Sequence, residues 1–449
     1  MIENSLEGHA PYTAPPTHHT DRYCIVGAGP SGLGTARAFA QAGIPFDVLE
    51  RHGDVGGIWD IGNARTPMYE TAHFISSRTQ SEFSDFPMPE TYPDYPNWKQ
   101  ILDYLRGFTE HHGLRQYIQF GADVRRIAPA GEQWEVTLAT GERRRYRGVV
   151  LAVGHNWDPL MPDYPGHFDG ECYHSFSYRS PIAFRGKRVL IVGGGNSGCD
   201  IACDAATHAE RAMISLRRGY YFLPKHIFGQ PLDVFFRQGP HIPLWLGQPL
   251  LAVLLRVLVG DLTRYGLPKP DHKVLASHPI MNTQLLHHLA HGDISAKPDV
   301  RELRGRRVLF TDGSEEEVDL IVYATGYRAT IPCLDDDGAS VLERGRLFLN
   351  IFPVDHPNLF VIGQFETDGG AYPVVSRQAE LVARAIALGP EERKRWLDRA
   401  RAARQPDLSA GVRYLSTPRH SFYVQFDAYN HYLDKLLKTL PALQPLSAR

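Results

Sequence analysis

The stretch Tyr23–Glu50, YCIVGAGPSGLGTARAFAQAGIPFDVLE, decides the fold of this chain. The apolar letters YCIV predict a short strand, the Ala-rich run that follows the glycines predicts a helix, and FDVL predicts a second strand that ends at Glu50. The sequence GAGPSG at 27–32 stands between the first strand and the helix and fits G-x-G-x-x-G. A strand, a glycine-rich turn, a helix and a second strand are typical of the first half of a dinucleotide-binding fold.

The glycines of this turn have separate physical tasks in such a fold. Gly27 allows the tight turn, Gly29 lets a pyrophosphate approach the backbone, and Gly32 lets the helix pack closely on the strand. Pro30 and Ser31 are also expected to bind the cofactor, because the N-terminus of the helix predicted at Leu33–Ala42 favours the negative charge of a phosphate. The motif alone is a weak signal, because ordinary turns also contain clustered glycines.

The end of the second strand indicates which dinucleotide the turn binds. Glu50 lies 23 residues after Gly27 (50 − 27), where a carboxylate accepts hydrogen bonds from a ribose 2′-hydroxyl and repels a 2′-phosphate. We therefore expect FAD or NAD at this turn, and not NADP. Gly57 and Trp59 follow in GGIW, and we expect this loop to pass beside the flavin; an ordinary turn with a core Trp is the alternative.

A second unit of the same kind begins 166 residues later (193 − 27), with RVLIV at Arg188–Val192 and GGGNSG at 193–198. Leu216 occupies the position that matches Glu50, and two arginines follow it. Because arginine forks bind a 2′-phosphate through charge-assisted hydrogen bonds, we expect NADPH here, with a solvated arginine pair as the alternative. The residues expected to bind this cofactor are Gly193, Gly195, Asn196, Ser197, Gly198, Arg217 and Arg218.

Two unlike units on one chain predict an α/β fold with two Rossmann-like dinucleotide-binding domains. The run Asp319–Gly326 (DLIVYATG) resembles Gly148–Gly154 (GVVLAVG), which indicates that the NADPH domain is inserted into the FAD domain. Thr325, Gly326 and Gly363 are counted among the cofactor-binding residues. The predicted divisions are a flexible tail at 1–20, the first segment of the FAD domain at 21–178, the NADPH domain at 179–324 with a substrate-side insertion at about 219–290, and the second segment of the FAD domain with C-terminal helices at 325–449.

Composition excludes several classes of protein. The 449 residues carry 48 Lys and Arg against 50 Asp and Glu, a formal charge of −2, without the basic surplus of a nucleic-acid-binding protein. Five cysteines with no C-x-x-C pair fit a reduced compartment and argue against thiol–disulfide chemistry. The first twenty residues lack the features of a signal peptide, so we expect a cytoplasmic protein.

Two other features of the sequence are interpreted as ordinary structural elements and not as a membrane span or a metal site. Leu244–Gly260 is strongly apolar, but it is short for a membrane span and contains Pro249 and Arg256. We therefore expect no stable membrane span but a buried or substrate-lining helix, with an interfacial helix as the alternative. His287 and His291 are four residues apart on a predicted helix, but no carboxylate or Cys completes a set of ligands, so no metal site is expected.

Four further motifs carry a resemblance to a known family. Phe168–Tyr178 fits F-x-G-x-x-x-H-x-x-x-Y, GNSGCDIA at 195–202 looks like an NADPH loop and helix, Ala324–Tyr327 is ATGY, and Ser84–Pro89 is like a P-D-F-P segment. With the two glycine turns, the chain resembles the flavin-containing monooxygenases, which are class B flavoprotein monooxygenases. The resemblance implies that NADPH reduces FAD, that O2 forms a C4a-(hydro)peroxyflavin, and that a nucleophilic nitrogen or sulfur of a small organic substrate is oxygenated.

The resemblance also selects residues near the chemistry. It places His174 near the domain junction. There the imidazole either couples NADPH binding to the relative orientation of the two domains or makes only a structural hydrogen bond. The family usually has an Asn beside the flavin, just before P-D-F-P, and this chain has none there. Ser77, Thr79 or Gln80 is expected to supply a polar contact in its place, and the sequence does not choose among them.

Two other activities stay open as alternatives. Related Baeyer–Villiger enzymes usually end the fingerprint on Trp followed by Pro or Asp, whereas Tyr178 and Arg179 stand here and favour heteroatom oxidation. The second alternative is an NADPH-dependent flavin reductase or oxidase that transfers no oxygen. The expected partners are a small-molecule substrate and O2, with no nucleic acid, and a homodimer is left open. We expect Gly219–Phe236 and Ile242–Leu258 to cover the substrate side.

Overall fold

The first layer of the fold is a seven-stranded sheet. The structure, a computed structural model, describes residues 18–239, 242–334, 341, 346–403 and 406–443. The strand order is β3-β2-β1-β6-β5-β4, β22 also pairs with β6, and β1 runs parallel to both β2 and β6. The strands are β1 (His18–Val26), β2 (Phe46–Leu49), β3 (Ile118–Gln119), β4 (Val124–Ala130), β5 (Gln133–Leu138), β6 (Arg143–Leu151) and β22 (Leu359–Val361).

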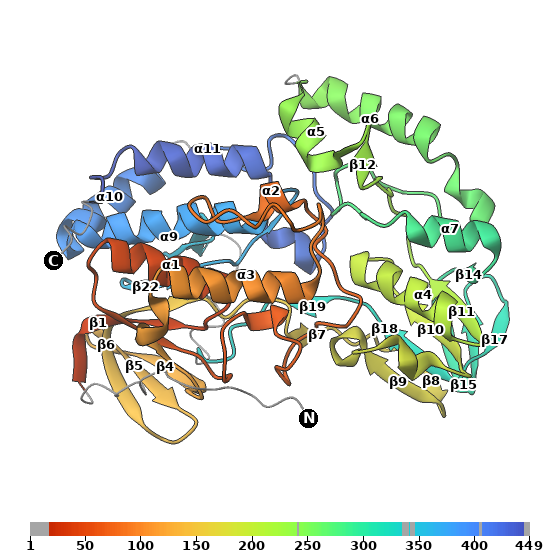
Figure 1. Cartoon of the computed structure of the whole chain (residues 1–449), viewed down its shortest axis with the longest axis horizontal. Helices are drawn as coiled ribbons and strands as arrows, with labels where there is room; N and C mark the ends of the chain where they lie inside the picture. Colours follow the sequence, from red (N-terminus) through yellow and green to blue (C-terminus); the bar gives the residue numbers. More distant parts are fainter. Residues whose placement is uncertain (1–17, 240–241, 335–340, 342–345, 404–405, 444–449) are drawn as a thin grey trace.

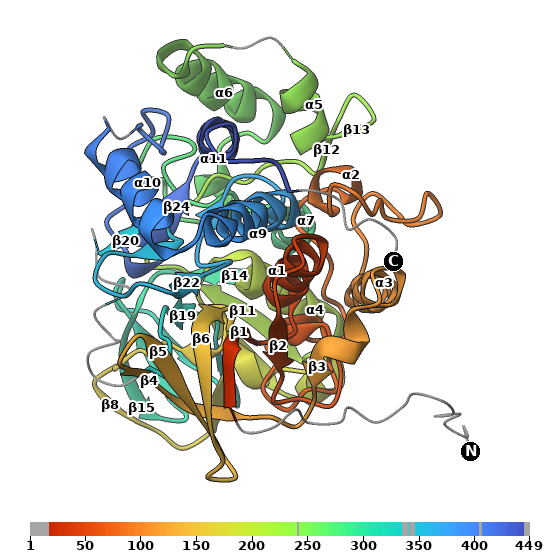
Figure 2. The same ribbon diagram turned by 90° about the vertical axis from the view of Figure 1, so that its left-hand side faces the viewer.

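Helices cover one face of this sheet. Figures 1 and 2 show α1 (Pro30–Gln41), α9 (Ala371–Ala387) and α3 (Trp98–His111) on the same side, with α11 (Phe426–Leu437) beyond α9. The glycine and alanine side of α1 lets it approach the sheet closely, and a capping box fixes the start of α3 at Asn97. The apolar sides of these helices and the sheet form one buried core.

The second layer is a five-stranded parallel sheet with the order β14-β11-β10-β18-β9. Helix α4 (Asn196–His208) follows β10 and packs on this sheet together with α7 (Gln284–His291), on the right of Figure 1. A smaller sheet of β8, β15, β16 and β17 lies beside it. The strands of the parallel sheet are β9 (Glu171–His174), β10 (Arg188–Val192), β11 (Arg211–Ser215), β14 (Ile294–Lys297) and β18 (Leu320–Tyr323).

All strands of the second sheet lie in the chain between β6 and β22, so this sheet is inserted into the first in chain order. The chain enters the second unit earlier than the predicted division at residue 178. Strand β9 pairs with β18, and β8 (Gly166–Phe168) pairs with β15 (Val300–Gly305). These entry strands are short and largely polar, which is why the sequence did not reveal them.

A lobe formed by α5 (Leu232–Gln238) and α6 (Leu244–Leu258) projects from the second unit in Figures 1 and 2. Leu251 and Leu255 of α6 pack in a small buried cluster, while Trp245 and Val257 are 77% and 76% exposed. The excursion ends before the predicted residue 290, because α7 packs in the core of the second sheet. Among the described residues, no helix has the length and apolar character that crossing a membrane requires.

Strand β1 begins within the predicted N-terminal tail. Residues 1–17 lie outside the described residues, but His18 to Thr20 belong to β1, so the expectation of a flexible tail to residue 20 is wrong for its last three residues. His19 is buried, with Nδ1 2.9 Å from Asp47 Oδ2 and its ring stacked on Tyr146 at 4.9 Å. The polar letters HHTD concealed this strand, in which pairing with β6 and the contact with Asp47 compensate the burial of His19.

Candidate functional site

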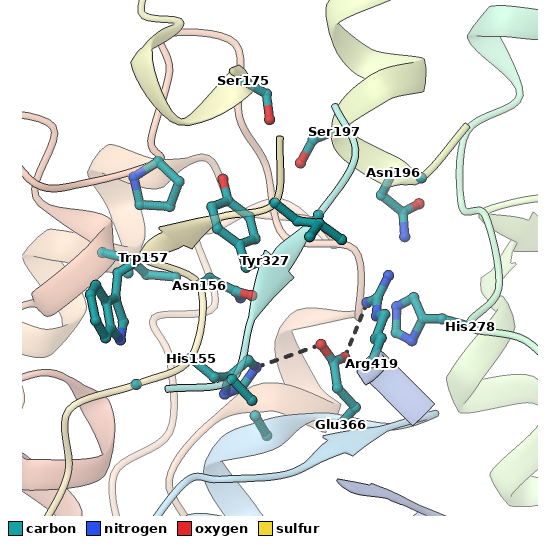
Figure 3. Close-up of a pocket in the computed structure, with 18 of the residues that line it drawn as sticks. His155, Asn156, Trp157, Ser175, Asn196, Ser197, His278, Tyr327, Glu366 and Arg419 are labelled. Atoms are coloured by element: carbon teal, nitrogen blue, oxygen red, sulfur yellow. Dashed lines mark hydrogen bonds and ion pairs between the residues drawn. The ribbon is translucent and has the colours of Figure 1, made fainter. Parts of the chain in front are cut away.

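A cavity of about 950 Å³ lies between the two sheets. The GAGPSG turn after β1 lines one side of it, and the GGGNSG turn after β10 lines another. Both turns lie at the carboxyl ends of parallel strands, where open α/β sheets bind their ligands. The remaining walls come from the segment after β6, from β23 (Glu366–Thr367) and from residues 415–422 near the C-terminus, several of which appear in the close-up of Figure 3.

The first turn has the geometry that its glycines predict. Gly27 has a φ of +105°, and a Cβ on Gly32 would lie 1.8 Å from the Gly27 carbonyl oxygen. Helix α1 starts after Gly29 with no side-chain cap, so the first N–H groups of the helix are open to the cavity. Gly27, Gly29, Pro30 and Ser31 line the cavity, whereas Gly32 serves the packing of helix on strand behind it.

Glu50 is fixed at the cavity wall, at the end of β2. Its Oε2 accepts a hydrogen bond from the Ala28 N–H at 2.6 Å, and its Oε1 accepts one from the His52 N–H at 2.8 Å. The side chain is 6% exposed, and the residue lines the cavity. Each carboxylate oxygen keeps a lone pair beyond these bonds, so Glu50 can still accept from a ribose hydroxyl.

The GGIW loop packs directly against the first turn. A Cβ on Gly57 would lie 2.9 Å from Gly29 Cα, and Gly57 has a φ of +59°, so the position suits glycine on both counts. Trp59 stands edge-on to Phe74, with ring centroids 4.7 Å apart, and contacts the cores of both sheets. Gly57 and Trp59 both line the cavity, and Trp59 also serves as a core residue.

The second turn repeats the geometry of the first. Gly193 has a φ of +117°, a Cβ on Gly198 would lie 2.1 Å from the Gly193 carbonyl oxygen, and a Cβ on Gly195 would meet no protein atom within 4 Å. Asn196 is occupied structurally, because its side chain donates to the Pro279 carbonyl at 3.1 Å and accepts from the Met281 N–H at 2.9 Å. All six residues 193–198 line the cavity.

Arg217 and Arg218 follow β11 and line the same cavity, whereas Leu216 is buried in the core of the second sheet. The strand end that carries Glu50 in the first unit therefore carries an apolar residue and two cations in the second. This difference in charge at equivalent places is the feature that separates the two turns.

We expect the double variant Arg217→Ala/Arg218→Ala to lose most of its preference for NADPH over NADH. Hydrogen bonds to charged groups contribute about 1.5–3 kcal/mol, so the ratio of kcat/KM values should fall about 10- to 150-fold, through a higher KM for NADPH. Anaerobic flavin reduction with each nucleotide measures the ratio. Arg211→Ala is the control, because Arg211 is on the same strand but exposed and paired with Glu316. A preference that survives the double substitution would contradict the assignment.

The two crossings between the units are held by backbone contacts. Thr325 Oγ1 donates to the Leu160 carbonyl at 2.5 Å, and the Leu160 N–H donates to the Gly326 carbonyl at 2.9 Å. Gly363 has a φ of +81°, and a Cβ there would lie 2.0 Å from Ser31 Oγ, so the end of β22 is pressed against the start of α1. Thr325, Gly326 and Gly363 all line the cavity.

The fingerprint residues His174 and Tyr178 lie behind the cavity wall. His174 is buried, its Nδ1 accepts from the Phe176 N–H at 3.0 Å, and its ring stands edge-on to Tyr327 at 5.1 Å. Burial lowers the pKa of His174, although a bond to the Gly326 backbone opposes this. Tyr178 is 1% exposed and donates to Asp204 Oδ2 at 2.8 Å. Both residues make structural contacts at the junction between the two units, and neither lines the cavity.

The three residues proposed to replace the family's Asn do not line the cavity. The Ser77 N–H donates to Asp233 Oδ2 at 2.7 Å, which ties this loop to α5. Thr79 is exposed, and Gln80 Oε1 accepts from Arg237. Ser76 lines the cavity instead, with its Oγ 2.6 Å from the Oγ of Ser81. Within this loop the cavity is therefore lined by Ser76 and by none of the three proposed residues.

Several cavity residues carried no signal in the sequence. His155, Asn156 and Trp157 follow β6 and line the cavity, and Figure 3 shows them across its open centre from Asn196. Their place after the apolar run of β6 could have marked them as residues at a strand's carboxyl end. The expected cover was mostly wrong, because α6 contributes no lining residue and Tyr220 alone represents Gly219–Phe236. Residues 277–280 and 415–422 line that side instead.

The residues present fit FAD and NADPH. Helices α1 and α4, of 12 and 13 residues, both begin at this cavity without a side-chain cap. The turn before each helix leaves no room for a Cβ on its last glycine, Gly32 or Gly198. Such N-termini bind phosphate through backbone N–H groups and the helix dipole. Glu50 suits a free ribose hydroxyl at one turn, and Arg217 and Arg218 suit a phosphate at the other. No group of three or more His, Cys, Asp or Glu that could hold a metal occurs among the described residues.

The sequence over residues 20–426 matches the model of the family described as FMO-like, flavin-binding monooxygenase-like. The chain belongs to this family. Flavin-containing monooxygenase 5 of Homo sapiens is 30% identical over 89% of this chain and 79% of its own length. Dimethylaniline monooxygenase [N-oxide-forming] 2 of Rattus norvegicus is 33% identical over 81% of this chain and 73% of its own.

Solved structures with low sequence identity share the fold. Cyclohexanone monooxygenase of Rhodococcus sp. Phi1 bound to NADP+ superposes with a TM-score of 0.71, at 18% identity, over 95% of this chain and 98% of its own. S-allyl-L-cysteine S-oxygenase of Allium sativum gives 0.64 at 19% identity, over 96% and 90%. This monooxygenase is therefore a mixed α/β enzyme that uses FAD and NADPH, with a small-molecule substrate and O2 as its co-substrates.

Proposed function

We propose that this monooxygenase oxygenates a nucleophilic nitrogen or sulfur of a small organic substrate, with FAD at the first turn and NADPH at the second. One observation carries this assignment: both turns face one cavity, but the strands behind them end on Glu50 in one case and on Leu216, Arg217 and Arg218 in the other. The names of the dimethylaniline N-oxide-forming relative and the S-allyl-L-cysteine S-oxygenase support the substrate class.

The same assignment gives each unit a cofactor. The first sheet with its covering helices is the FAD domain, and the inserted second sheet is the NADPH domain. The return of the chain to β22 after β18 supports this division. The cofactor domains would then meet where Trp59 contacts both cores.

The protein residues bind, orient and exclude water. When bound, FAD supplies the redox and oxygen chemistry and NADPH supplies the electrons. The N–H groups at the starts of α1 and α4 hold the phosphates, and Glu50, Arg217 and Arg218 select the nucleotide. Trp59, together with Phe74 and Tyr372, forms an aromatic wall that limits the access of water.

Rapid mixing tests the proposed activity. The holoenzyme reduced anaerobically with NADPH and mixed with O2 should show a long-lived absorbance band that differs from oxidised and reduced flavin. A thioether or tertiary amine should then shorten its lifetime and yield a sulfoxide or N-oxide. Immediate return to oxidised flavin with stoichiometric peroxide would support the reductase or oxidase alternative instead. Conversion of ketones to esters in preference to thioethers would support the Baeyer–Villiger alternative.

A further inference from the structure

An ion pair on the C-terminal side of the cavity has no role in the cofactor assignment above. Strand β23 runs parallel to β24 (Tyr423–Val424), and this pairing places Arg419 against Glu366. Arg419 Nη2 donates to Glu366 Oε2 at 3.0 Å. Both residues line the cavity, and Figure 3 shows Glu366 between His155 and Arg419, with both charged groups turned toward the open centre.

Both members of the pair are ionised. Burial alone would raise the pKa of Glu366, but Arg419 and then His155 hold it well below its ordinary value. Burial alone would lower the pKa of Arg419, but Glu366 keeps it above its ordinary value. The imidazoles of His278 and His420 add no charge at neutral pH, because burial and Arg419 lower the pKa of His278 to about 3 and that of His420 to about 4.

Each member of the pair has unused hydrogen-bonding capacity that faces the cavity. The Arg419 side chain is 42% exposed, and its N–H groups other than the one bonded to Glu366 have no acceptor among the described residues. The other oxygen of Glu366 has only a long contact, 3.5 Å to His155 Nε2, among those residues. Such groups are left to water or to a ligand.

We propose that Arg419 and Glu366 bind the zwitterionic head group of an amino-acid substrate, with its carboxylate on Arg419 and its ammonium on Glu366. A ligand with only a negative charge would be attracted by Arg419 but repelled by the carboxylate of Glu366. A ligand with only a positive charge would be attracted by Glu366 but repelled by Arg419. A zwitterion brings one charge of each sign and adds no net charge to a partly buried site. The inference rests on the proposed function and narrows its substrate to an amino acid with a thioether or amine side chain.

Calorimetric titration of the wild-type holoenzyme with NADP+ present tests this without turnover. The probes are norleucine, whose side chain has no nitrogen or sulfur, and two analogues that each lack one charge: hexanoate, without the ammonium, and pentylamine, without the carboxylate. Norleucine should bind about 10- to 100-fold more tightly than either analogue, because each loses a hydrogen bond to a charged group. Equal binding of hexanoate or pentylamine, or no binding of norleucine, would overturn the proposal.

Variants then assign the two charges. Arg419→Gln should weaken the binding of norleucine about 10- to 100-fold, and Glu366→Gln should do the same. Arg413→Gln, on the same segment but outside the cavity lining, should bind as wild type. Folding is checked by FAD content and melting temperature, and Arg419→Lys should recover some of the affinity. Unchanged affinity in folded Arg419→Gln or Glu366→Gln would contradict the assignment.

Methionine, the thioether counterpart of norleucine, separates this inference from the proposed function. Oxygenation of methionine in preference to its amide and its N-acetyl derivative, each of which lacks one charge, would support both. If norleucine binds selectively but no substrate is oxygenated, the binding assignment stands and the proposed function fails. If an uncharged thioether is oxygenated as efficiently as methionine, the proposed function stands and the zwitterion site is wrong.

Discussion

Gly32→Ala should give a protein that has lost FAD. The new Cβ would lie 1.8 Å from the Gly27 carbonyl oxygen, which is backbone and cannot rotate away. Either α1 moves off β1 or the turn opens, and both displace the N–H groups that face the phosphates. We expect flavin content below about a tenth of wild type and a loss of at least about 1–3 kcal/mol in the free energy of unfolding. The flavin-to-protein absorbance ratio and denaturant unfolding measure these.

Gly53→Ala is the matched control for this substitution. Gly53 lies near the same end of the first sheet, has no positive φ, and a Cβ there meets nothing within 4 Å. It should retain flavin and stability. Full flavin content in Gly32→Ala would show that the turn tolerates the displacement and that close packing of helix on strand is not what positions the phosphates.

Gly198→Ala should separate the two cofactor sites. Its Cβ would lie 2.1 Å from the Gly193 carbonyl oxygen, so the second turn must open in the same way. The first sheet has its own core, and FAD should therefore stay bound. We expect reduction by NADPH to slow at least about 100-fold, the equivalent of about 3 kcal/mol, while dithionite reduces the flavin normally. Stopped-flow absorbance compares the two reductants.

Gly195→Ala distinguishes a clash with the protein from a clash with the ligand. A Cβ there meets no protein atom within 4 Å, so the variant should fold and melt as wild type. Any rise in the KM for NADPH then reports the close approach of the dinucleotide to the backbone. Normal NADPH kinetics in Gly195→Ala would mean that the pyrophosphate does not pass this residue.

The regions of the molecule that sequence predicted well are governed by local rules. A strand, a glycine-rich turn and a helix in direct succession leave few alternatives, so both turns and the packing role of Gly32 followed from spacing. Glu50 and Leu216 could also be compared, because each ends the strand that follows its turn. These are contacts between neighbours in the chain, for which the order of residues carries most of the information.

The regions that sequence missed depend on contacts between distant segments. Arg419 meets Glu366 only because β24 returns to pair with β23, and no motif surrounds either residue. Ser76 lines the cavity, while the N–H of Ser77 bonds to Asp233 of α5, a difference of one residue in a loop without regular periodicity. Tyr178 matched a family motif, yet its hydroxyl donates to Asp204 and does not line the cavity. The sequence motifs identified some of these positions and loops, but they did not specify where each side chain points.

The pairing of β22 with β6 has a consequence for how the chain folds as it is synthesised. Leu359 pairs with Val149, 210 residues earlier (359 − 149), and the whole second sheet lies in the intervening chain. While the ribosome makes that chain, Val149–Leu151 at the end of β6 pair with β1 but lack their partner on the other side, whereas the second sheet can close from its own strands. Such distant pairing folds slowly and leaves an aggregation-prone edge, so the inserted unit should mature before the unit that surrounds it.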